Sequence, residues 1–243
     1  MKKHNIDKLK KPVAFMHVAT LHHYQEIVDD VLVRAVNSKL LDDLDFLQLN
    51  LVGEGDVDIS IVKDKRLREK IKITRVGVLS DFDMATIKIL NDFARSTPHT
   101  PILFLQTLSV SDYNYNIPGY KDRRDLFFYF TITQYKKCLS YLQDYDTCSV
   151  QWNKDWPKFK KYSPAHWSGN MWWTTSDYIK TLPSYEWMDT PANYVLDRRH
   201  QAEFFIGFNP QVKYKSLYTW AFKNLKKEAL PESMYIDNKY NNN

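Results

Sequence analysis

Short apolar runs alternate with amphipathic segments along about the first 150 residues of the chain. The run "PVAFMHVA" (12–19) has the length and continuity of a strand that is buried on both faces. In "YQEIVDDVLVRAVNSKL" (24–40) the apolar residues recur at helical spacing, and acidic residues lie near the start, where they favour a helix N-terminus. The segment "DFLQLNLVG" (45–53) then predicts a second strand. Together the three segments predict a β-α-β unit.

The alternation continues with three further strands and two helices. The strands are predicted at 71–79, 100–107 and 146–152, and the helices at 80–96 and 123–145, the second despite its β-branched centre. Strands separated by helices favour a mostly parallel sheet with helices on both faces. In such a sheet, ligands bind beyond the carboxyl ends of the strands. The expected fold is therefore α/β.

The last third of the chain has a less regular pattern. A polar, proline-punctuated loop follows residue 152, and a further helix is predicted at 189–208. We expect a basic lead at 1–11, one domain at 12–228, and a frayed polar tail at 229–243, which ends in "YNNN". The sequence shows no internal repeat and no linker.

Composition mainly excludes classes of protein. Only 6 of the 243 residues are glycine, 44% are hydrophobic and 26% are charged, which is ordinary for a globular protein. The net charge of +5 favours anionic ligands without requiring nucleic acid. Cys138 and Cys148 fit no metal spacing and are expected to be buried free thiols. Because no run approaches roughly 18 apolar residues and no signal region is visible, we expect a soluble, cytoplasmic protein without a transmembrane segment.

Familiar phosphate-binding and nucleophile motifs are missing from the sequence. It contains no glycine-rich phosphate loop, no nucleophile elbow and no paired Cys or His metal spacing. Any site must therefore be built from polar residues at the ends of the predicted strands. These candidates are His17, Asp81, Asp83, Gln106, Thr107, Asp122, Arg123 and Arg124.

Each of these candidates also has a structural interpretation. Asp81 and Asp83 are suited to share a divalent cation, but an acidic pair before a helix also caps free backbone N–H groups. Arg124 is suited to clamp phosphate oxygens, or it belongs to a solvated cluster of ion pairs. His17 is flanked by apolar residues, which is typical of a core histidine as well as of a ligand.

The densest aromatic stretch is "HWSGNMWWTTSDY" (166–178). Indole faces suit the C–H faces of sugar rings, the hydroxyl and amide side chains beside them suit sugar hydroxyls, and Gly169 would let a ligand approach the backbone. In the alternative interpretation, Trp172 and Trp173 alternate across a strand, with one ring in the core and one against a helix. The period alone does not decide which ring faces a ligand.

A second cluster follows in "RRHQAEFFIG" (198–207), which places His200 and Glu203 three residues apart on one side of a predicted helix. Glu203 is suited to act as a base near a reacting hydroxyl, and His200 to complete a metal shell. The alternative is a half-exposed pair on a helix whose next apolar residues are buried.

The chain resembles a family of small glycosyltransferases of large DNA viruses and some bacteria, which includes chlorella-virus rhamnosyltransferase-type domains. The segments that carry the resemblance, from about residue 12 to 208, are "FMHVA", "DMATIKILNDFA", "ILFLQT", "KDRRDLFFYF", "HWSGNMWWTTSDYIKTLP" and "RHQAEFFIG". The resemblance implies a GT-A fold, a nucleotide-sugar donor and usually a divalent cation, Mn²⁺ or Mg²⁺. Two positions depart from the family: "QTLS" (106–109) stands where His-Thr-Lys-Gly is common, and Arg123 where a tryptophan is common.

The resemblance also implies site residues, position by position. Contacts to the donor or its nucleotide are implied for His17, Val18, Ala19, Asp83 and Arg124. Contacts to the donor sugar or the acceptor are implied for His166, Ser168, Gly169, Asn170, Trp172 and Trp173. From their chemistry, Glu203 and Asp122 are the candidates for a catalytic base, and Asp81, Asp83 and His200 for metal ligands.

The sequence thus favours a glycosyltransferase that moves a sugar from a nucleotide-diphosphate donor, first of all a UDP-sugar, to a hydroxyl of a glycan or glycoprotein. This hypothesis requires an indole face toward the sugar and a cleft that Asp83 shares with Arg124. The alternatives are a carbohydrate- or nucleotide-binding module without turnover and a glycoside hydrolase. For a viral protein, the expected location is the host cytoplasm.

Overall fold

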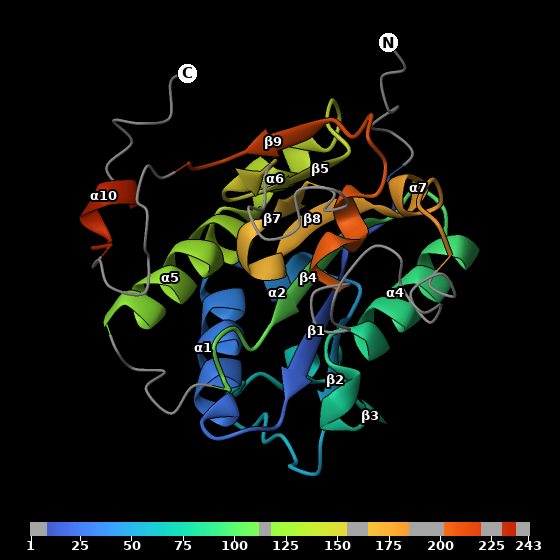
Figure 1. Cartoon of the computed structure of the whole chain (residues 1–243). Helices are drawn as coiled ribbons and strands as arrows, with labels where there is room; N and C mark the ends of the chain where they lie inside the picture. Colours follow the sequence, from blue (N-terminus) through green and yellow to red (C-terminus); the bar gives the residue numbers. More distant parts are fainter. Residues whose placement is uncertain (1–8, 112–117, 155–164, 185–201, 220–229, 237–243) are drawn as a thin grey trace.

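The described part of the chain forms a seven-stranded mixed sheet with helices on both faces (Figure 1). The computed structural model describes residues 9–111, 118–154, 165–184, 202–219 and 230–236. The strands of the sheet are β1 (Val13–Ala19), β2 (Leu47–Val52), β3 (Ile71–Gly77), β4 (Pro101–Gln106), β5 (Thr147–Ser149), β8 (Trp172–Thr175) and β9 (Tyr214–Ser216). A separate two-stranded sheet pairs β6 (Trp152–Asn153) with β7 (His166–Trp167). In the large sheet the order is β3-β2-β1-β4-β8-β5-β9.

Strand direction divides the large sheet into two parts. The strands β3, β2, β1 and β4 run parallel, whereas β8 is antiparallel to β4 and β5, and β9 is parallel to β5. The chain adds β2 and β3 on one side of β1 and then returns to place β4 on the other side. The winding therefore reverses between β1 and β4, and this is the topological switch point of the sheet.

Helices supply the outer layers of the fold (Figure 1). The α-helices are α1 (Tyr24–Asn37), α2 (Leu40–Asp43), α3 (Lys65–Arg68), α4 (Met84–Ser96), α5 (Pro118–Phe128), α6 (Tyr135–Tyr141), α7 (Ser176–Ile179) and α10 (Ser233–Ile236). Shorter turns are η2 (Leu79–Asp81), η3 (Tyr129–Thr133), η5 (Ser168–Asn170) and η6 (Phe205–Gly207). Helices α1, α5 and α6 pack on one face of the sheet, and α4 and α7 on the other.

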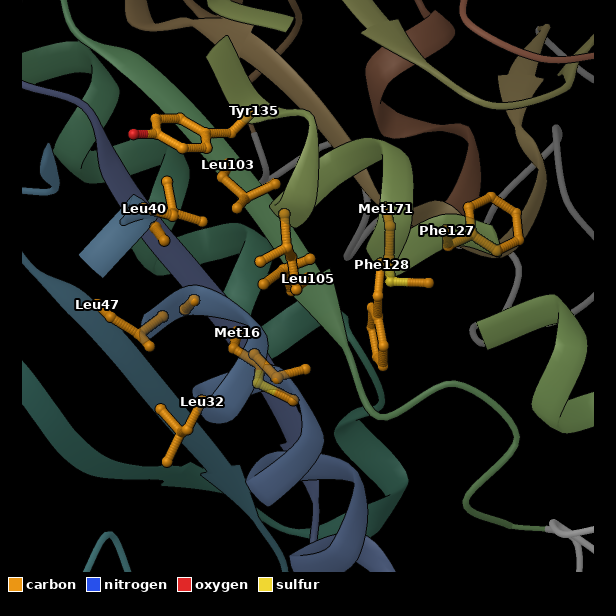
Figure 2. Packing of buried hydrophobic residues seen from close by; sticks show 14 of the residues in the cluster. Met16, Leu32, Leu40, Leu47, Leu103, Leu105, Phe127, Phe128, Tyr135 and Met171 are labelled. Carbon is orange, nitrogen blue, oxygen red and sulfur yellow. The ribbon is translucent and has the colours of Figure 1, made fainter. Parts of the chain in front are cut away.

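The strand side chains alternate between two hydrophobic clusters. On β1, Met16 belongs to the cluster beneath α1 and α5, and Phe15 to the cluster beneath α4. Figure 2 shows the first cluster, in which Met16 and Leu105 of the sheet lie with Leu32 of α1 and Phe128 of α5. Because successive side chains of a strand point to opposite faces, a strand covered on both faces needs a nearly continuous apolar run.

The predicted α/β fold is confirmed, and so are its N-terminal elements. The strands expected at 12–19, 45–53, 71–79 and 100–107 are β1 to β4. The segment 24–40 forms α1 and the start of α2, 80–96 forms η2 and α4, and 146–152 contains β5. Most of the helix predicted at 189–208 lies outside the described residues.

The helix predicted over 123–145 is interrupted at its β-branched centre. Helix α5 gives way to the π-helical turn η3, and α6 follows. Thr131 donates its hydroxyl to the carbonyl oxygen of Phe127 at 2.7 Å, and the indole N–H of Trp173 donates to the carbonyl oxygen of Thr131 at 2.8 Å. A π-turn takes carbonyl groups out of the regular helical ladder. This one thereby provides a partner for a buried indole, which the apolar core could not.

The segment 230–236 packs against the core, so the prediction of a frayed tail is wrong for these residues. Leu230 and Tyr235 are only 2% and 3% exposed. The ring centroid of Tyr235 lies 5.3 Å from that of Tyr129 and 6.2 Å from that of Phe130. The composition of the segment is polar, but these two apolar side chains anchor it.

Cys138 and Cys148 are buried free thiols, as predicted. Burial raises the pKa of the Cys148 thiol, which keeps it protonated and unreactive. Within the residues described, no helix has the length and apolar character needed to cross a bilayer.

Candidate functional site

A pocket of about 140 Å³ opens at the switch point, where β1 and β4 end. Its walls come from the end of β1, the segment after β4, the turn before α4 and the segment around Glu203. Among the residues that line it are His17, Ala19, Asp83, Gln106, Thr107 and Glu203, all of which sequence reasoning had singled out. Their common position follows from the parallel strands, whose carboxyl ends meet at one edge of the sheet.

Thr107 fixes the two strand ends to each other. Its backbone N–H donates to the carbonyl oxygen of His17 at 3.0 Å, and its hydroxyl accepts from the N–H of Ala19 at 3.1 Å. The hydroxyl proton of Thr107 is not used in this contact. Thr107 therefore both closes the crevice between β1 and β4 and presents a donor at the pocket wall.

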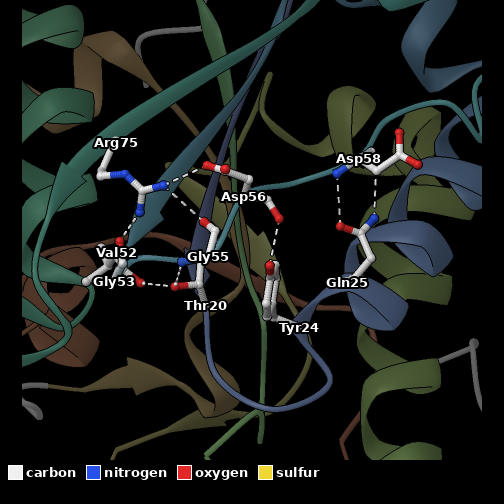
Figure 3. A network of polar contacts seen from close by, with 9 residues as sticks. All are labelled: Thr20, Tyr24, Gln25, Val52, Gly53, Gly55, Asp56, Asp58 and Arg75. Carbon is white, nitrogen blue, oxygen red and sulfur yellow. Dashed lines mark hydrogen bonds and ion pairs between the residues drawn. The ribbon is translucent and has the colours of Figure 1, made fainter.

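A polar network holds the loop after β2 beside the pocket (Figure 3). Arg75 donates to the carbonyl oxygens of Gly53 and Gly55 and pairs with Asp56 at 2.8 Å. Thr20 donates to the carbonyl oxygen of Val52 at 3.2 Å and accepts from the N–H of Gly55 at 3.1 Å. Because Thr20 follows the last residue of β1, the network makes that end of the pocket rigid. Sequence reasoning missed it, since its members lie in three separate segments.

His17 and Asp83 form a pair in the pocket. The Nε2 atom of His17 lies 3.3 Å from Oδ1 of Asp83, and its Nδ1 atom lies 3.2 Å from the hydroxyl of Thr86. His17 is only 3% exposed, and burial lowers its pKa although the attraction to Asp83 opposes this shift. The ring is therefore neutral near pH 7. Both interpretations of His17 hold, since it is a buried, satisfied histidine that also reaches the pocket.

The second carboxylate oxygen of Asp83 is fixed from the opposite side. Asn170 donates its Nδ2 amide to Oδ2 of Asp83 at 3.0 Å, and its Oδ1 accepts from the indole N–H of Trp172 at 2.9 Å. Asp83 does not cap α4 with its side chain. Asn170 thus contributes to the site through Asp83, and this chain of hydrogen bonds holds the carboxylate in one orientation.

The predicted tryptophan wall is wrong. Trp172 and Trp173 both have an exposed fraction of 0%. Trp172 stacks on Phe104 with ring centroids 5.0 Å apart, in the cluster beneath α4, and Trp173 lies in the opposite cluster. Because adjacent residues of a strand face opposite sides and β8 is covered on both, neither ring has a free face for a sugar.

The other residues of the 166–170 segment also serve the protein interior. Gly169 has a φ of +72°, and a Cβ there would lie 2.9 Å from the Phe127 ring, so this position is filled by protein rather than open to a ligand. Its carbonyl oxygen accepts from Gln106 at 2.6 Å. His166 is 2% exposed and packs edge-to-face on Phe204, and neither it nor Ser168 lines the pocket. The predicted sugar contacts of these residues are not supported.

The predicted metal site is not assembled by the described residues. Asp81 accepts from the backbone N–H of Val78 at 2.9 Å and does not line the pocket, and both oxygens of Asp83 already have partners. His200 lies outside the described residues. Across the described ranges, no three His, Cys, Asp or Glu side chains are grouped closely enough to hold a metal ion. Asp81 thus has the capping role that was the alternative interpretation, and the residues present do not fit a cation shared with Asp83.

Three other predicted residues lie away from the Asp83 pocket. Arg124 is 5% exposed and borders a separate pocket of about 170 Å³ between α1 and α5, so it shares no cleft with Asp83. Asp122 accepts from the backbone N–H of Leu230 at 2.8 Å, which ties the C-terminal segment to α5. Val18 is fully buried in the core. The predicted donor contacts of Arg124 and Val18, and the catalytic role of Asp122, are therefore wrong.

Glu203 is the second carboxylate of the pocket. It attracts Arg123, the residue of α5 next to the one that the sequence had favoured. Successive helical residues differ by about 100° in direction, so the arginine that faces the site could not be chosen from the sequence. The pocket thus combines a neutral histidine, two carboxylates and hydroxyl donors.

No protein-family model matches the chain, and no curated protein matches it significantly. Similar solved structures include HddC from Yersinia pseudotuberculosis, with 10% identity, 86% of this chain and 90% of that chain covered, and a TM-score of 0.43. Another is 4-diphosphocytidyl-2C-methyl-D-erythritol synthase, with 8% identity, 93% and 95% covered, and a TM-score of 0.41. A third is TarS (1–349) from S. aureus, with 10% identity, 86% and 60% covered, and a TM-score of 0.36.

Proposed function

We propose that the chain is a nucleotide-sugar-dependent glycosyltransferase whose donor binds in the pocket at the switch point. The observation that carries the proposal is that His17, Asp83 and Glu203 line one pocket at the carboxyl ends of β1 and β4. Open parallel sheets bind their ligands in this crevice, because the loops on its two sides diverge. The resemblance to small glycosyltransferases adds the reaction class and a UDP-sugar as the first donor to test. The proposal no longer includes the tryptophan wall or the Arg124 clamp.

The pocket residues suit the polar parts of a nucleotide sugar. Thr107 has a hydroxyl proton available, and Ser109 and Ser111 also line the wall. These hydroxyls would donate to phosphate or ribose oxygens, and the fixed carboxylate of Asp83 would accept from a ribose or sugar hydroxyl. A site whose donors and acceptors are already fixed binds with less loss of conformational freedom.

Glu203 would accept the proton of the sugar acceptor. In a single displacement, the acceptor oxygen forms a bond to the anomeric carbon while the bond from that carbon to the diphosphate oxygen breaks. The nucleoside diphosphate leaves with the bonding electron pair, the hydroxyl proton passes to Glu203, and the anomeric carbon inverts. The protein's contribution is to hold the two substrates in line, which replaces a bimolecular encounter by an oriented one. A role for Mn²⁺ or Mg²⁺ stays a prediction from the resemblance, and no step here depends on it.

The first test is thermal stability with a panel of nucleotide sugars, each with and without Mn²⁺ or Mg²⁺. A donor at 100 times its Kd stabilises the folded state by about 2.7 kcal/mol, which raises Tm by several degrees. Asp83→Asn should weaken donor binding by roughly tenfold or more, because it removes a charged acceptor. Asp92→Asn, on the exposed side of α4, is the matched control and should bind like the wild type.

Turnover is the second measurement. Glu203→Gln should bind the donor and lose roughly 10²-fold or more in transfer rate. Donor binding by the wild type without any transfer would support the binding module instead. Release of sugar from a glycan in the absence of nucleotide would support a glycoside hydrolase. The proposal is abandoned if no donor raises the Tm of the wild type.

A further inference from the structure

Arg123 lies in the interior next to the proposed site. It is half-buried on α5, its Nη2 donates to the hydroxyl of Ser168 at 3.3 Å, and its guanidinium carbon lies 5.8 Å from the centroid of the Phe127 ring. Its Nε is shielded from solvent and has no hydrogen-bond partner among the described residues. An interior cation with an unused donor is costly unless an anion is near.

The anion near Arg123 is Glu203. Burial lowers the pKa of Arg123, and the attraction to the Glu203 carboxylate raises it. An arginine stays protonated in proteins, so a positive charge faces Glu203 at neutral pH. The pair therefore joins α5 to the segment that forms one wall of the pocket.

The segment 166–170 holds both members of the pair. Ser168 binds the guanidinium of Arg123, and His166 packs edge-to-face on Phe204, the residue after Glu203, with centroids 4.8 Å apart. Asn170, two residues beyond Ser168, binds Asp83. One short segment thus connects Arg123 with both carboxylates of the pocket.

We propose that Arg123 is a positioning residue that keeps the Glu203 carboxylate ionised and directed at the pocket. The other titratable groups around Glu203 are Asp83 and His17 in the same pocket, His166 beside Phe204, and Tyr120 beside Arg123. The negative charge of Asp83 favours a proton on Glu203, and the positive charge of Arg123 opposes it. Arg123 thus keeps Glu203 able to accept a proton. The kinetic part of this inference rests on the proposed function, whereas the effect on ionisation does not.

The kinetic test compares the pH dependence of kcat/KM for the wild type, Arg123→Gln and Arg123→Lys. In Arg123→Gln the acid limb should move to higher pH by roughly one unit or more, because the carboxylate loses its nearby cation. The loss should fall on kcat more than on KM, and Arg123→Lys should restore part of it. Lys121→Gln, which removes an exposed cation of the same helix, should leave the profile unchanged. A variant that lowers activity at every pH without moving the limb would show a merely structural role.

A titration that needs no turnover separates this inference from the proposed function. The side-chain carboxyl of Glu203 can be followed by ¹³C NMR and assigned by its absence in Glu203→Gln. Its midpoint should rise in Arg123→Gln and, by a smaller amount, in Ser168→Ala, which keeps the charge but removes its anchor. Ser168→Ala and Arg123→Lys supply the comparison if Arg123→Gln does not fold. Unchanged midpoints in folded variants would overturn the inference. A raised midpoint in a protein that transfers no sugar would leave it standing while the proposed function fails.

Discussion

Asp83 is the residue on which the proposed site depends. One carboxylate oxygen lies 3.3 Å from His17, the other accepts from Asn170, and Asn170 is held by the indole N–H of Trp172. The side chain of Asp83 remains 14% exposed and reaches the pocket. Trp172 therefore supports the site through its edge, from within the core, rather than through an open face.

Gly169 provides a test at this scale. We expect Gly169→Ala to lower the free energy of unfolding by about 1–3 kcal/mol, because an L side chain is strained at a φ of +72° and the new Cβ would contact the Phe127 ring. Urea unfolding measures the change. In a Phe127→Leu background the same substitution should cost less, since a smaller side chain then faces it. Unchanged stability with a large loss of donor affinity would contradict this account and restore the predicted close approach of a ligand.

Residues at strand ends could be predicted, but the direction of individual side chains could not. His17, Asp83 and Glu203 were identified because chain position alone brings them to one edge of the sheet or to the predicted late helix. Trp172 and Trp173 misled because their composition suits a sugar equally well as a core that offers hydrogen-bond partners. Those partners, Asn170 and the carbonyl oxygen of Thr131, belong to tertiary structure and leave no pattern in the sequence.

At the scale of elements, the segment from α5 to α6 has the most tasks. Its first turns carry Arg123 toward Glu203 and Asp122 toward Leu230, and the π-turn that follows receives Trp173. The β-branched residues that form this turn were visible in the sequence as a weakness of the predicted helix. The sequence did not show that the interruption is needed, since the indole that it serves is 42 residues away.

The C-terminal helix α10 gives a prediction at this scale. We expect Asp122→Ala to lower the free energy of unfolding by about 1.5–3 kcal/mol, because it removes a charged acceptor from the backbone N–H of Leu230. Asp122→Asn keeps an acceptor and should lose less. Hydrogen exchange at the Leu230 amide should accelerate in both variants, and more in the first. If Asp122→Ala is as stable as the wild type but transfers no sugar, Asp122 returns as the catalytic base.

At the scale of the whole molecule, the reversal of winding between β1 and β4 creates the site. The parallel strands β3, β2, β1 and β4 follow from apolar runs and helical spacing, and for this half the sequence was sufficient. The antiparallel insertion of β8 between β4 and β5 was not predicted, because its four residues contain no turn signal and pair with strands far apart in the chain. This insertion brings Asn170 to Asp83, so the part of the fold that the sequence did not reveal also completes the pocket.

The most direct test of the account is whether a nucleotide sugar binds beside His17. The chain has seven histidines, and ring ¹⁵N NMR can distinguish them after assignment by single substitution. His99 is an internal control, because it precedes β4 and pairs with Asp177, at the opposite end of that strand from the pocket. Titration with a donor that raises Tm should shift the ring signals of His17 in a saturable way and leave those of His99 unchanged. If a donor binds and the His17 signals do not move, the nucleotide sugar occupies another site and the central claim is wrong.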